Sequence, residues 1–508
     1  MSNWDYADEI PTATTTMKSN KNDSYCWEQD WKDANAVATQ LNIPIHQVSF
    51  QAEYWNEVFQ PYCQQLTRSV TPNPDVDCNR YIKFGALKDY LKKRFSGDID
   101  TLATGHYARI WDRSRSNSGN STSIGGIHTT MNQMPHYLQE ALEEEESTIL
   151  ADYILHSSVA DTPMLLSARD CSKDQSYFLS GVPAKAFSGV LFPLGDLYKT
   201  EPGVDSTNYS KDDGDGDDID DSVLSVRQVA RHAQLPNATK RDSVGICFIG
   251  KRKHGDFISE YIDHPLNDSY DGRSSSSTSS LVQCINVENN EVVATFDHVD
   301  SPSLTYATIG QGAKISGAAQ KWFVVDKQLQ PPQHTNNYNN GQWKWKSPCL
   351  FICPGTHHPS LYADKFYIRC KNFNWIAGGG ETNRPPPLPF RAKCRIRHLQ
   401  PLVDCEITMV NNQNHSQNHN CTTSQDVLGV FDDDNYEIRL KLPLRGIAPG
   451  QVCVVYAGGK EGDLICLGGG PIDQRGPNYW EMQQDLPKIL HPSGRNDRSI
   501  IQKGTDGS

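Results

Sequence analysis

Long apolar runs are missing from this sequence. No segment reaches the roughly 18 to 20 consecutive apolar residues that a membrane-spanning helix needs, so we expect no membrane span. The 14 cysteines are scattered over 508 residues, which excludes a small disulfide-stapled scaffold and favours a reducing compartment. Hydrophobic residues make up only 37% of the chain, so we expect polar insertions around two or three domain cores.

Basic residues are scarce relative to acidic ones. The chain has 48 Lys and Arg against 61 Asp and Glu, which gives a formal net charge of -13. This balance argues against a protein that coats nucleic acid through its overall charge, although acidic insertions can coexist with a local basic face. Residues 1–9 are also acidic, unlike the leader of a secreted or organelle-targeted protein.

Several short motifs are present, and the first is the segment 71–80, TPNPDVDCNR. Two prolines flank Asn73 and hold the backbone in a turn. Asp75 follows, and Cys78 comes where a helical pattern begins. Because a helix N-terminus favours anions, this cysteine is a candidate thiolate nucleophile. An ordinary capped helix with an incidental cysteine would give the same pattern.

Helices and short strands alternate in the first part of the chain. The expected elements are helices over 27–41 and 55–66 and strands over 45–50 and 100–105. This alternation indicates a parallel α/β sheet, in which ligands bind where strands end. Gly105 and His106 follow the second strand, where the glycine would let a ligand approach the backbone and the imidazole could donate to a phosphate or base. An ordinary strand-end turn would also explain both.

Two polar segments, 113–160 and 201–221, are predicted to be surface insertions. Between them, Lys173, Asp174 and Gln175 precede an aromatic and apolar run. Taken alone, these three residues predict only a capped helix.

A second candidate cysteine, Cys247, lies in a short apolar run between two glycines. Lys240, Arg241, Lys251 and Arg252 bracket it. Cationic neighbours lower the pKa of a thiol and attract an RNA backbone. A buried structural cysteine in a strand would give the same pattern.

Short β-type runs dominate from about residue 287, which predicts an all-β region that is best explained as a small barrel. Cys349, Cys353, His357 and His358 lie close together in this region, but their irregular spacing does not match a zinc site, so no metal is expected. Residues 476–508 are predicted to form a frayed tail.

The motifs form an ordered set. They are Thr71-Pro-Asn-Pro-Asp with Cys78-Asn, Ala103-Thr-Gly-His-Tyr-Ala-Arg, Lys173-Asp-Gln-Ser-Tyr-Phe, Gly245-Ile-Cys-Phe-Ile-Gly, Thr308-Ile-Gly-Gln, Val324-Val-Asp-Lys, Phe373-Asn-Trp-Ile, Pro449-Gly-Gln and Cys466-Leu-Gly-Gly-Gly. Together they closely resemble the tRNA-specific 2-thiouridylases over nearly the whole chain apart from the insertions.

The resemblance implies a fold and an activity. The fold would be α/β, with a parallel-sheet ATP-pyrophosphatase (PP-loop, Rossmann-like) domain over 1–250, a small central domain over 251–312 and a C-terminal tRNA-binding β-barrel over 313–475. The activity would be the sulfurtransferase reaction that 2-thiolates the wobble uridine of tRNA. In that reaction Mg-bound ATP adenylates the uridine, and a cysteine persulfide delivers the sulfur. An upstream persulfide carrier or cysteine desulfurase would supply it, in mitochondria or, less expected, in plastids or cytoplasm.

The resemblance also assigns roles to residues. Cys247 matches the persulfide carrier, Cys78 matches the nucleophile, and the two would pass through a transient disulfide. Asp75, with Asn73 and Pro74, corresponds to the contact with the flipped target base. The remaining matches are Met1 and Gly105 for the nucleotide, and His106, Lys173, Asp174, Gln175, Arg395, Ile396 and Gln451 for tRNA.

One element of the family pattern is not found in the 508 residues. It is the Ser-Gly-Gly-x-Asp-Ser-Ser loop, whose backbone amides cradle the pyrophosphate of ATP. Met1 already resembles the end of the family's second strand, so we expect the first strand, the loop, the following helix and the second strand to be missing from an incomplete gene model. A targeting sequence would be lost with them. The alternative is a tRNA-binding paralogue without catalytic activity. A thiol oxidoreductase is less well supported because no Cys-x-x-Cys motif is present.

Overall fold

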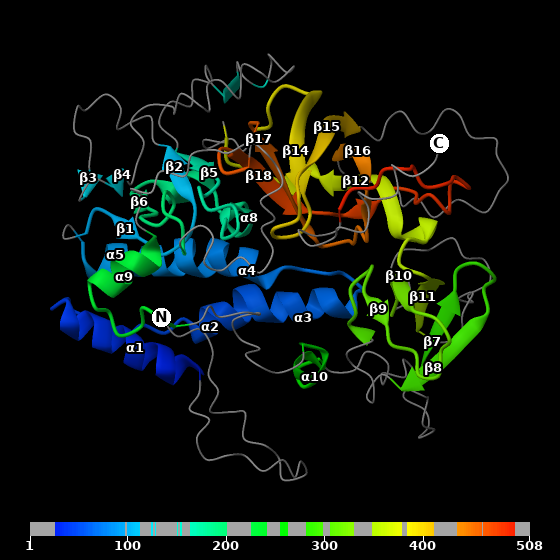
Figure 1. The fold of residues 1–508 in the computed structure, drawn as a ribbon, viewed down its shortest axis with the longest axis horizontal. Helices are drawn as coiled ribbons and strands as arrows, with labels where there is room; N and C mark the ends of the chain where they lie inside the picture. The colour runs from blue at the N-terminus through cyan, green and yellow to red at the C-terminus, as the bar shows by residue number, and fades with distance from the viewer. Residues whose placement is uncertain are drawn as a thin grey trace, which may run out of the picture.

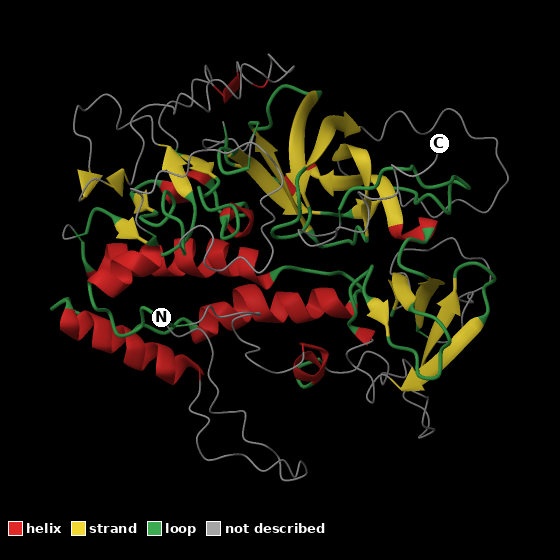
Figure 2. Cartoon of the chain, viewed as in Figure 1, coloured by secondary structure: helices red, strands yellow, loops and turns green. Residues whose placement is uncertain are grey.

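A computed structural model describes residues 26–96, 99–111, 123–124, 127–128, 150, 153–154, 163–200, 225–240, 254–262, 281–297, 305–329, 348–377, 384–410, 434–459 and 461–492. Met1, Cys247 and the predicted insertion 201–221 lie outside these residues. Figure 1 shows two long helices side by side, a β-barrel against one of them and a smaller sheet at one end. Figure 2 shows the same separation of helices and strands. No helix of the described part is long and apolar enough to cross a membrane.

The first predicted helix is confirmed as α1 (Cys26–Gln40). The turn that follows it contains Asn42, whose φ of +53° is a left-handed conformation that asparagine tolerates better than most residues. The strand expected over 45–50 is wrong, since only Ser49 makes a single bridge there. An extended β-rich segment becomes a strand only when a neighbouring strand is available to pair with it.

The two long helices are each built from three consecutive segments. The first consists of α2 (Gln51–Tyr54), η1 (Trp55–Phe59) and α3 (Gln60–Thr67), and the second of α4 (Pro74–Asp77), η2 (Cys78–Ala86) and α5 (Leu87–Arg94). Both η segments are π-helical. Segment η1 ends at Phe59, two residues before Pro61, and proline cannot donate a backbone hydrogen bond. Val58, Tyr62 and Ile82 belong to the core between the two helices.

The predicted parallel sheet is confirmed but small. Strand β1 (Leu102–Ala103) pairs in parallel with β6 (Val190–Leu191), and these two strands form the whole sheet within the described residues. Helix α9 (Val226–His232) begins with a capping box between Ser225 and Gln228. Neither α5 nor α9 contains a buried residue, and Leu41 after α1 is 46% exposed, because two short strands cannot cover three helices.

The central sheet has the strand order β8-β7-β11-β10-β9. Its strands are β7 (Leu281–Asn286), β8 (Val292–Asp297), β9 (Gly312–Ala313), β10 (Trp322–Gln328) and β11 (Cys349–Pro354). The boundary predicted at residue 312 therefore does not follow the pairing, since β10 and β11 complete this sheet. The chain passes from the central sheet to the barrel between Pro354 and Tyr362.

The barrel is formed by a ten-stranded sheet that confirms the predicted all-β region. Its strands are β2 (Arg109–Trp111), β5 (Met164–Leu166), β12 (Tyr362–Arg369), β13 (Asn374–Trp375), β14 (Phe390–Arg395), β15 (Val403–Val410), β16 (Asn435–Arg445), β17 (Val452–Ala457), β18 (Ile465–Pro471) and β19 (Gln474–Arg475). Strands β2 and β5 extend the barrel sheet from the first part of the chain. The pair β15–β16 ends at Val410 and Asn435, which face each other in register.

Short elements complete the described chain. They are β3 (Ser123–Ile124), β4 (Ile127–His128), α8 (Ser176–Leu179), η4 (Ala184–Phe187), α10 (His254–Ser259), η5 (Pro359–Leu361) and η6 (Cys370–Asn372).

Two predictions of polar surface segments need correction. Leu150 and Ile154, within the predicted insertion 113–160, are fully buried in the barrel core. In the predicted tail, Leu486 and Leu490 pack against buried residues of the central sheet and barrel, and Asn478 is only 2% exposed. These few apolar side chains hold the segments against the core. The sequence did not predict this because most residues around them are polar.

Candidate functional site

The segment 71–80 forms the start of the second long helix, as predicted. Asn73 has an extended backbone, and its side-chain Oδ1 accepts a hydrogen bond from the Asp75 amide at 3.1 Å. Pro74 occupies the first helical position, where no backbone donor is needed. Cys78 lies in the second turn of this helix, so the helix dipole acts on it less than on a residue of the first turn.

Cys78 faces the space between the two long helices. Its side chain is 7% exposed and belongs to the same apolar cluster as Tyr62, Ile82 and Phe257. It is also the first residue of the π-helical segment η2. Short π-helical stretches frequently occur at functional sites, because they change the direction of side chains along one face of a helix.

The two carboxyl groups next to Cys78 have raised pKa values. Burial raises the pKa of Asp75, and the cation of Lys83 partly opposes this. Burial also raises the pKa of Asp77 to about 6, against an opposing contribution from Arg80. A carboxyl group whose pKa moves towards neutrality is suited to proton transfer, so Asp75 has the character expected of an acid–base group beside a thiol.

His106 is held in one neutral tautomer. Burial lowers the pKa of its imidazole to about 3, and the Lys83 cation contributes. The Asn79 side-chain amide donates to the carbonyl oxygens of Asp75 and Phe178, so its Oδ1 accepts from His106 Nε2 at 3.1 Å. Thr104 Oγ1 must then donate to Nδ1, at 2.8 Å. A neutral ring with both nitrogens engaged provides no positive charge for a phosphate.

Gly105 is exposed beside this imidazole. A Cβ atom added there would approach only the Leu194 side chain, at 3.9 Å, which is an ordinary contact. The packing of the described residues therefore does not require glycine at this position. The prediction that Gly105 allows close approach of a ligand is compatible with this open space.

Side chains of the Lys173–Gln175 segment form hydrogen bonds with residues before it, directly after it and near His106. The Asp174 carboxylate is 3% exposed and accepts hydrogen bonds from the backbone of Ala168 and from both the amide and hydroxyl of Ser176. The Gln175 side-chain oxygen accepts from the Tyr107 amide at 2.9 Å. These side chains order the loop, so a direct contact of the Asp174 carboxylate with tRNA would require those hydrogen bonds to open.

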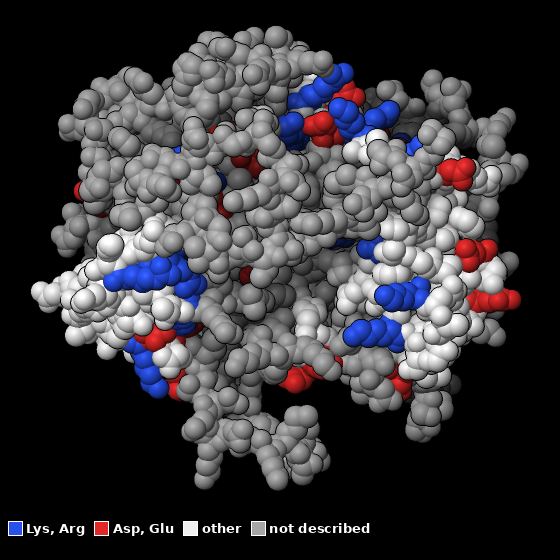
Figure 3. Space-filling model, viewed as in Figure 1, with Lys and Arg blue, Asp and Glu red and all other residues white. Residues whose placement is uncertain are grey.

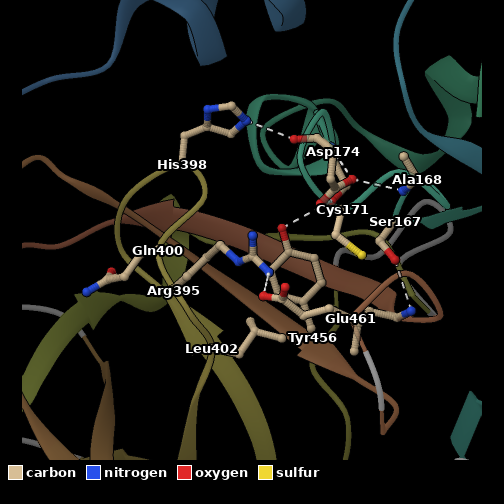
Figure 4. Close-up of polar contacts among 12 residues, drawn as sticks. Ser167, Ala168, Cys171, Asp174, Arg395, His398, Gln400, Leu402, Tyr456 and Glu461 are labelled. Carbon is tan, nitrogen blue, oxygen red and sulfur yellow. Dashed lines mark hydrogen bonds and ion pairs between the residues drawn. The ribbon is translucent and has the colours of Figure 1, made fainter. Parts of the chain in front are cut away.

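Arg395 is also turned inward. Its side chain is 2% exposed, and its guanidinium lies 5.2 Å from the centre of the Tyr456 ring and 3.3 Å from a carboxylate oxygen of Glu461. Figure 4 shows this arrangement, together with His398, which donates to the Asp174 carbonyl at 2.8 Å. Arg395 Nε has no hydrogen-bond partner within the described chain.

The barrel contacts the segment that leads to Cys78. The Thr71 amide donates to the Pro449 carbonyl at 2.8 Å. Gly450 has a φ of +84°, and a Cβ atom there would lie 3.0 Å from the Thr71 backbone, so glycine is required on both grounds. The adjacent Gln451 side chain accepts from the Ala448 amide at 3.1 Å, which orders this turn.

Tyr177 on α8 joins the same contact. Its hydroxyl donates to the carbonyls of Ile396 and Val452, at 3.1 and 2.8 Å, and the Asn73 side chain lies beside it. The structure therefore brings Asn73 together with Ile396 and the turn at Gln451, both of which follow it by more than 300 residues in sequence.

Three site residues were not predicted from the sequence: Tyr62, Tyr177 and His254. Tyr62 and His254 form a hydrogen bond, the Asp75 charge contributes to the raised pKa of the Tyr62 phenol, and Tyr177 links α8 to the barrel. Tyr177 lies within the Lys173 motif, which gave a signal for it. Nothing in the sequence around Tyr62 or His254 distinguishes them from ordinary helix residues.

The fold and site define an α/β nucleotide-type domain joined to a β-barrel that contacts its proposed catalytic helix. The family model for a "tRNA methyl transferase HUP domain" matches residues 9–125 and 127–204, and that for an "Aminomethyltransferase beta-barrel domain" matches 416–472. The tRNA-specific 2-thiouridylase MnmA of Listeria innocua is 30% identical over 93% of this chain and 86% of its own length. The mitochondrial tRNA-specific 2-thiouridylase 1 of Danio rerio is 28% identical over 96% and 87%, and that of Gallus gallus is 28% identical over 95% and 87%. The chain belongs to the tRNA-specific 2-thiouridylase family.

Proposed function

We propose that this protein is a tRNA sulfurtransferase that 2-thiolates the wobble uridine with consumption of ATP. The observation that carries the proposal is the helix start at 73–78, where Asp75 and Cys78 follow one another by about one helical turn beside the barrel. The similarity to enzymes named tRNA-specific 2-thiouridylases, over more than nine-tenths of the chain, supports the choice of substrate.

The proposed reaction uses two cysteines and one carboxyl group. ATP activates the uridine by adenylating its C2 oxygen. The terminal sulfur of a persulfide on Cys247 then attacks C2, and AMP leaves with that oxygen. Cys78 attacks the Cys247 sulfur, so the S–S bond to the uridine sulfur breaks and a Cys78–Cys247 disulfide forms. Asp75 would exchange a proton with the base, and a thiol reductant would restore both cysteines.

The chain connectivity is compatible with this relay. Helix α10 packs beside Cys78, since Phe257 is fully buried in the same cluster. Cys247 precedes His254, the first residue of α10, by seven positions (254 − 247). Seven residues span at most about 25 Å, so the sequence tethers Cys247 within reach of the Cys78 region.

Some of the proposed tRNA residues would contact tRNA directly, and others would order the surfaces that do. Lys173 lies on the loop next to α8, and the barrel contributes the turn at Gln451. We infer that Asp174, Gln175 and Arg395 act mainly by ordering these surfaces, because their side chains make internal contacts. Met1 and Gly105 remain the proposed nucleotide contacts. The upstream persulfide carrier and a mitochondrial location are proposed from the relatives alone.

The test is mass spectrometry of tRNA nucleosides from a thiouridine-deficient bacterium that expresses this chain, with a bacterial relative as positive control. Cys78→Ser and Cys247→Ser should each lower 2-thiouridine at least about 100-fold, because each removes a reacting sulfur. Cys63→Ser is the matched control, since Cys63 lies on the facing helix and burial raises the pKa of its thiol to about 12. Undiminished 2-thiouridine in Cys78→Ser would contradict the proposed relay.

A tRNA-binding protein without catalysis is the second candidate. In that case the chain would retain tRNA in a gel-shift assay but produce no 2-thiouridine in the complemented strain.

A further inference from the structure

Asn79 directly follows Cys78 and has no role in the reaction proposed above. It is only 2% exposed and belongs to the π-helical segment η2. Its side-chain nitrogen donates to the main-chain carbonyls of Asp75 and Phe178, at 3.0 and 3.1 Å. Its Oδ1 lies 3.1 Å from His106 Nε2. This one side chain therefore joins the helix of Cys78 to α8 and to the loop that follows β1.

The two carbonyls determine how the Asn79 amide is oriented. A carbonyl oxygen can only accept a hydrogen bond, so the amide nitrogen faces Asp75 and Phe178 and the amide oxygen faces His106. His106 Nε2 then carries the imidazole hydrogen, and the Thr104 hydroxyl donates to Nδ1 at 2.8 Å. Each polar atom of the buried amide thus has a partner of the right kind.

Apolar contacts hold the same elements together. The ring centres of His106 and Phe84, which lies on η2, are 5.8 Å apart. A Cβ atom added to Gly181, two residues after α8, would lie 2.6 Å from Val76 Cγ1 on α4. Because α8 and the loop after β1 both pack directly against the second long helix, a buried amide between them has to find its hydrogen-bond partners there.

We propose that Asn79 is a positioning residue that holds the turn of Asp75 and Cys78 in a fixed orientation against α8 and the loop after β1. Its three hydrogen bonds act where the α-helical segment α4 passes into π-helical η2. His106 contributes through a neutral imidazole, so this role needs no positive charge. The inference rests on the proposed function only for the use of Asp75 and Cys78 in sulfur transfer.

The test measures how fast iodoacetamide alkylates Cys78 in the intact folded chain, with peptide mass spectrometry as the readout. The Cys78 side chain is 7% exposed, so alkylation requires its turn to open locally. Asn79→Leu keeps a side chain of similar size but removes all three hydrogen bonds. It should accelerate the alkylation of Cys78 about tenfold or more. Asn79→Ala serves as the second variant if Asn79→Leu folds poorly.

Lys88→Met is the matched control. Lys88 lies ten residues beyond Cys78 (88 − 78) on the same long helix. Its Nζ donates to the carbonyls of Ala186 and Ser188, at 2.6 and 2.7 Å. The control therefore removes two hydrogen bonds between this helix and the segment after α8, but none at the turn of Cys78. It should change the alkylation rate of Cys78 less than about twofold.

Variants at His106 test its contribution separately. His106→Gln, whose amide nitrogen can donate in place of Nε2, should keep the alkylation rate of Cys78 within about twofold of wild type. His106→Leu removes the donor and should give an acceleration smaller than that of Asn79→Leu, because the two bonds to carbonyls remain. Equal acceleration in both His106 variants would contradict the part assigned to this hydrogen bond.

The inference also predicts an effect on the proposed reaction. In the complemented strain, Asn79→Leu should lower 2-thiouridine at least about tenfold, because the reacting groups are misplaced. The purified variant should still retain tRNA in a gel-shift assay as well as wild type does.

Three results would overturn the inference. They are an unchanged alkylation rate in Asn79→Leu, equal acceleration in Asn79→Leu and Lys88→Met, and 2-thiouridine at the wild-type level in Asn79→Leu. Failure of the proposed function is recognised separately. In that case the alkylation rates follow the expected pattern, but the wild-type chain produces no 2-thiouridine in the complemented strain.

Discussion

The acidic residues of the first helical turn show which of two opposing effects dominates at this site. A helix dipole stabilises an anion at its N-terminus by roughly 0.3 to 1 kcal/mol. Burial acts in the other direction and raises the pKa of Asp77 from the ordinary 3.8 to about 6, a difference of about 3 kcal/mol. Burial therefore outweighs the dipole, and the segment before Cys78 is less anionic at neutral pH than its sequence suggests.

This balance predicts how stability depends on pH. The folded protein holds a proton on Asp77 up to about pH 6, whereas the unfolded chain releases it near its ordinary value. The stability contributed by this protonation is therefore present at low pH and is lost as pH rises through about 6. Asp77→Asn should raise the free energy of unfolding at pH 7.5 by about 1 to 2 kcal/mol, allowing for partial exposure.

The measurement is urea unfolding of wild type and Asp77→Asn at pH 4 and pH 7.5. The two proteins should be equally stable at pH 4, where Asp77 is protonated in the folded state. A stability gain at pH 4 equal to that at pH 7.5 would attribute the effect to packing rather than to ionisation.

At the residue scale, the sequence predicted the local backbone structure around the candidate residues better than it predicted what each side chain contacts. Asn73, Pro74, Asp75 and Cys78 form the capped helix start that their spacing indicated, because capping is a local interaction. Whether a polar side chain faces solvent or the interior depends on distant partners. Arg395 could not be recognised as buried, since its neighbours Tyr456 and Glu461 are about 60 residues away.

At the scale of elements, the contact between the barrel turn and the 71–80 segment positions the start of the Cys78 helix. Gly450 lies directly against the Thr71 backbone, and the Thr71 amide is hydrogen-bonded to Pro449. No spare space remains between the turn and the segment. The placement of Asp75 and Cys78 therefore depends on a residue of the barrel.

Gly450→Ala tests this dependence. The new Cβ would require a backbone shift as well as a strained φ of +84°, so we expect a loss of at least about 3 kcal/mol in urea unfolding. Gly355→Ala is the matched control, since Gly355 has a φ of +76° but nothing within 4 Å of the added atom. The control should lose only about 1 kcal/mol. Equal losses in both variants would show that backbone strain alone, and not the contact with Thr71, explains the effect.

The strands of the barrel were predictable, and the pairing between them was not. Runs such as 452–456 are apolar and β-branched, and they appear as β17 and its neighbours. The pairing of β2 and β5 with the barrel joins segments more than 290 residues apart, and β10 and β11 belong to the central sheet. Long-range pairing of this kind leaves no local signal in the sequence.

At the scale of the whole molecule, one arginine joins the first part of the chain to the barrel. Arg109 is 5% exposed and lies 3.5 Å from Asp196 and 3.4 Å from Asp463. Its Nε donates to the Ser167 carbonyl at 2.8 Å, and another nitrogen donates to the Gly462 carbonyl. Removing this side chain would leave two carboxylates and two carbonyls without their shared partner.

Arg109→Met should therefore lower the free energy of unfolding by about 3 to 5 kcal/mol. The matched control is Lys393→Met, which removes a more exposed cation 3.0 Å from Asp404 and should cost less than about 1 kcal/mol. Circular dichroism during urea unfolding measures both. A loss in Arg109→Met as small as that of the control would mean that the two parts are held together by apolar packing alone.

The charged side chains are unevenly distributed over the surface. Figure 3 shows Lys and Arg side chains of the described residues in separate groups on the face in view, with acidic side chains between them. With a net charge of -13, tRNA binding would rely on local groups of this kind rather than on the overall field.

The pairing of Val410 with Asn435 has a practical consequence for protein engineering. The chain leaves β15 at Val410 and resumes β16 at Asn435, and these two positions are neighbours across a ladder. The entropic cost of closing a loop grows only logarithmically with its length once its ends are adjacent. A fluorescent reporter whose own termini lie close together could therefore be spliced between these positions, and evolution could lengthen the same connection at little thermodynamic cost.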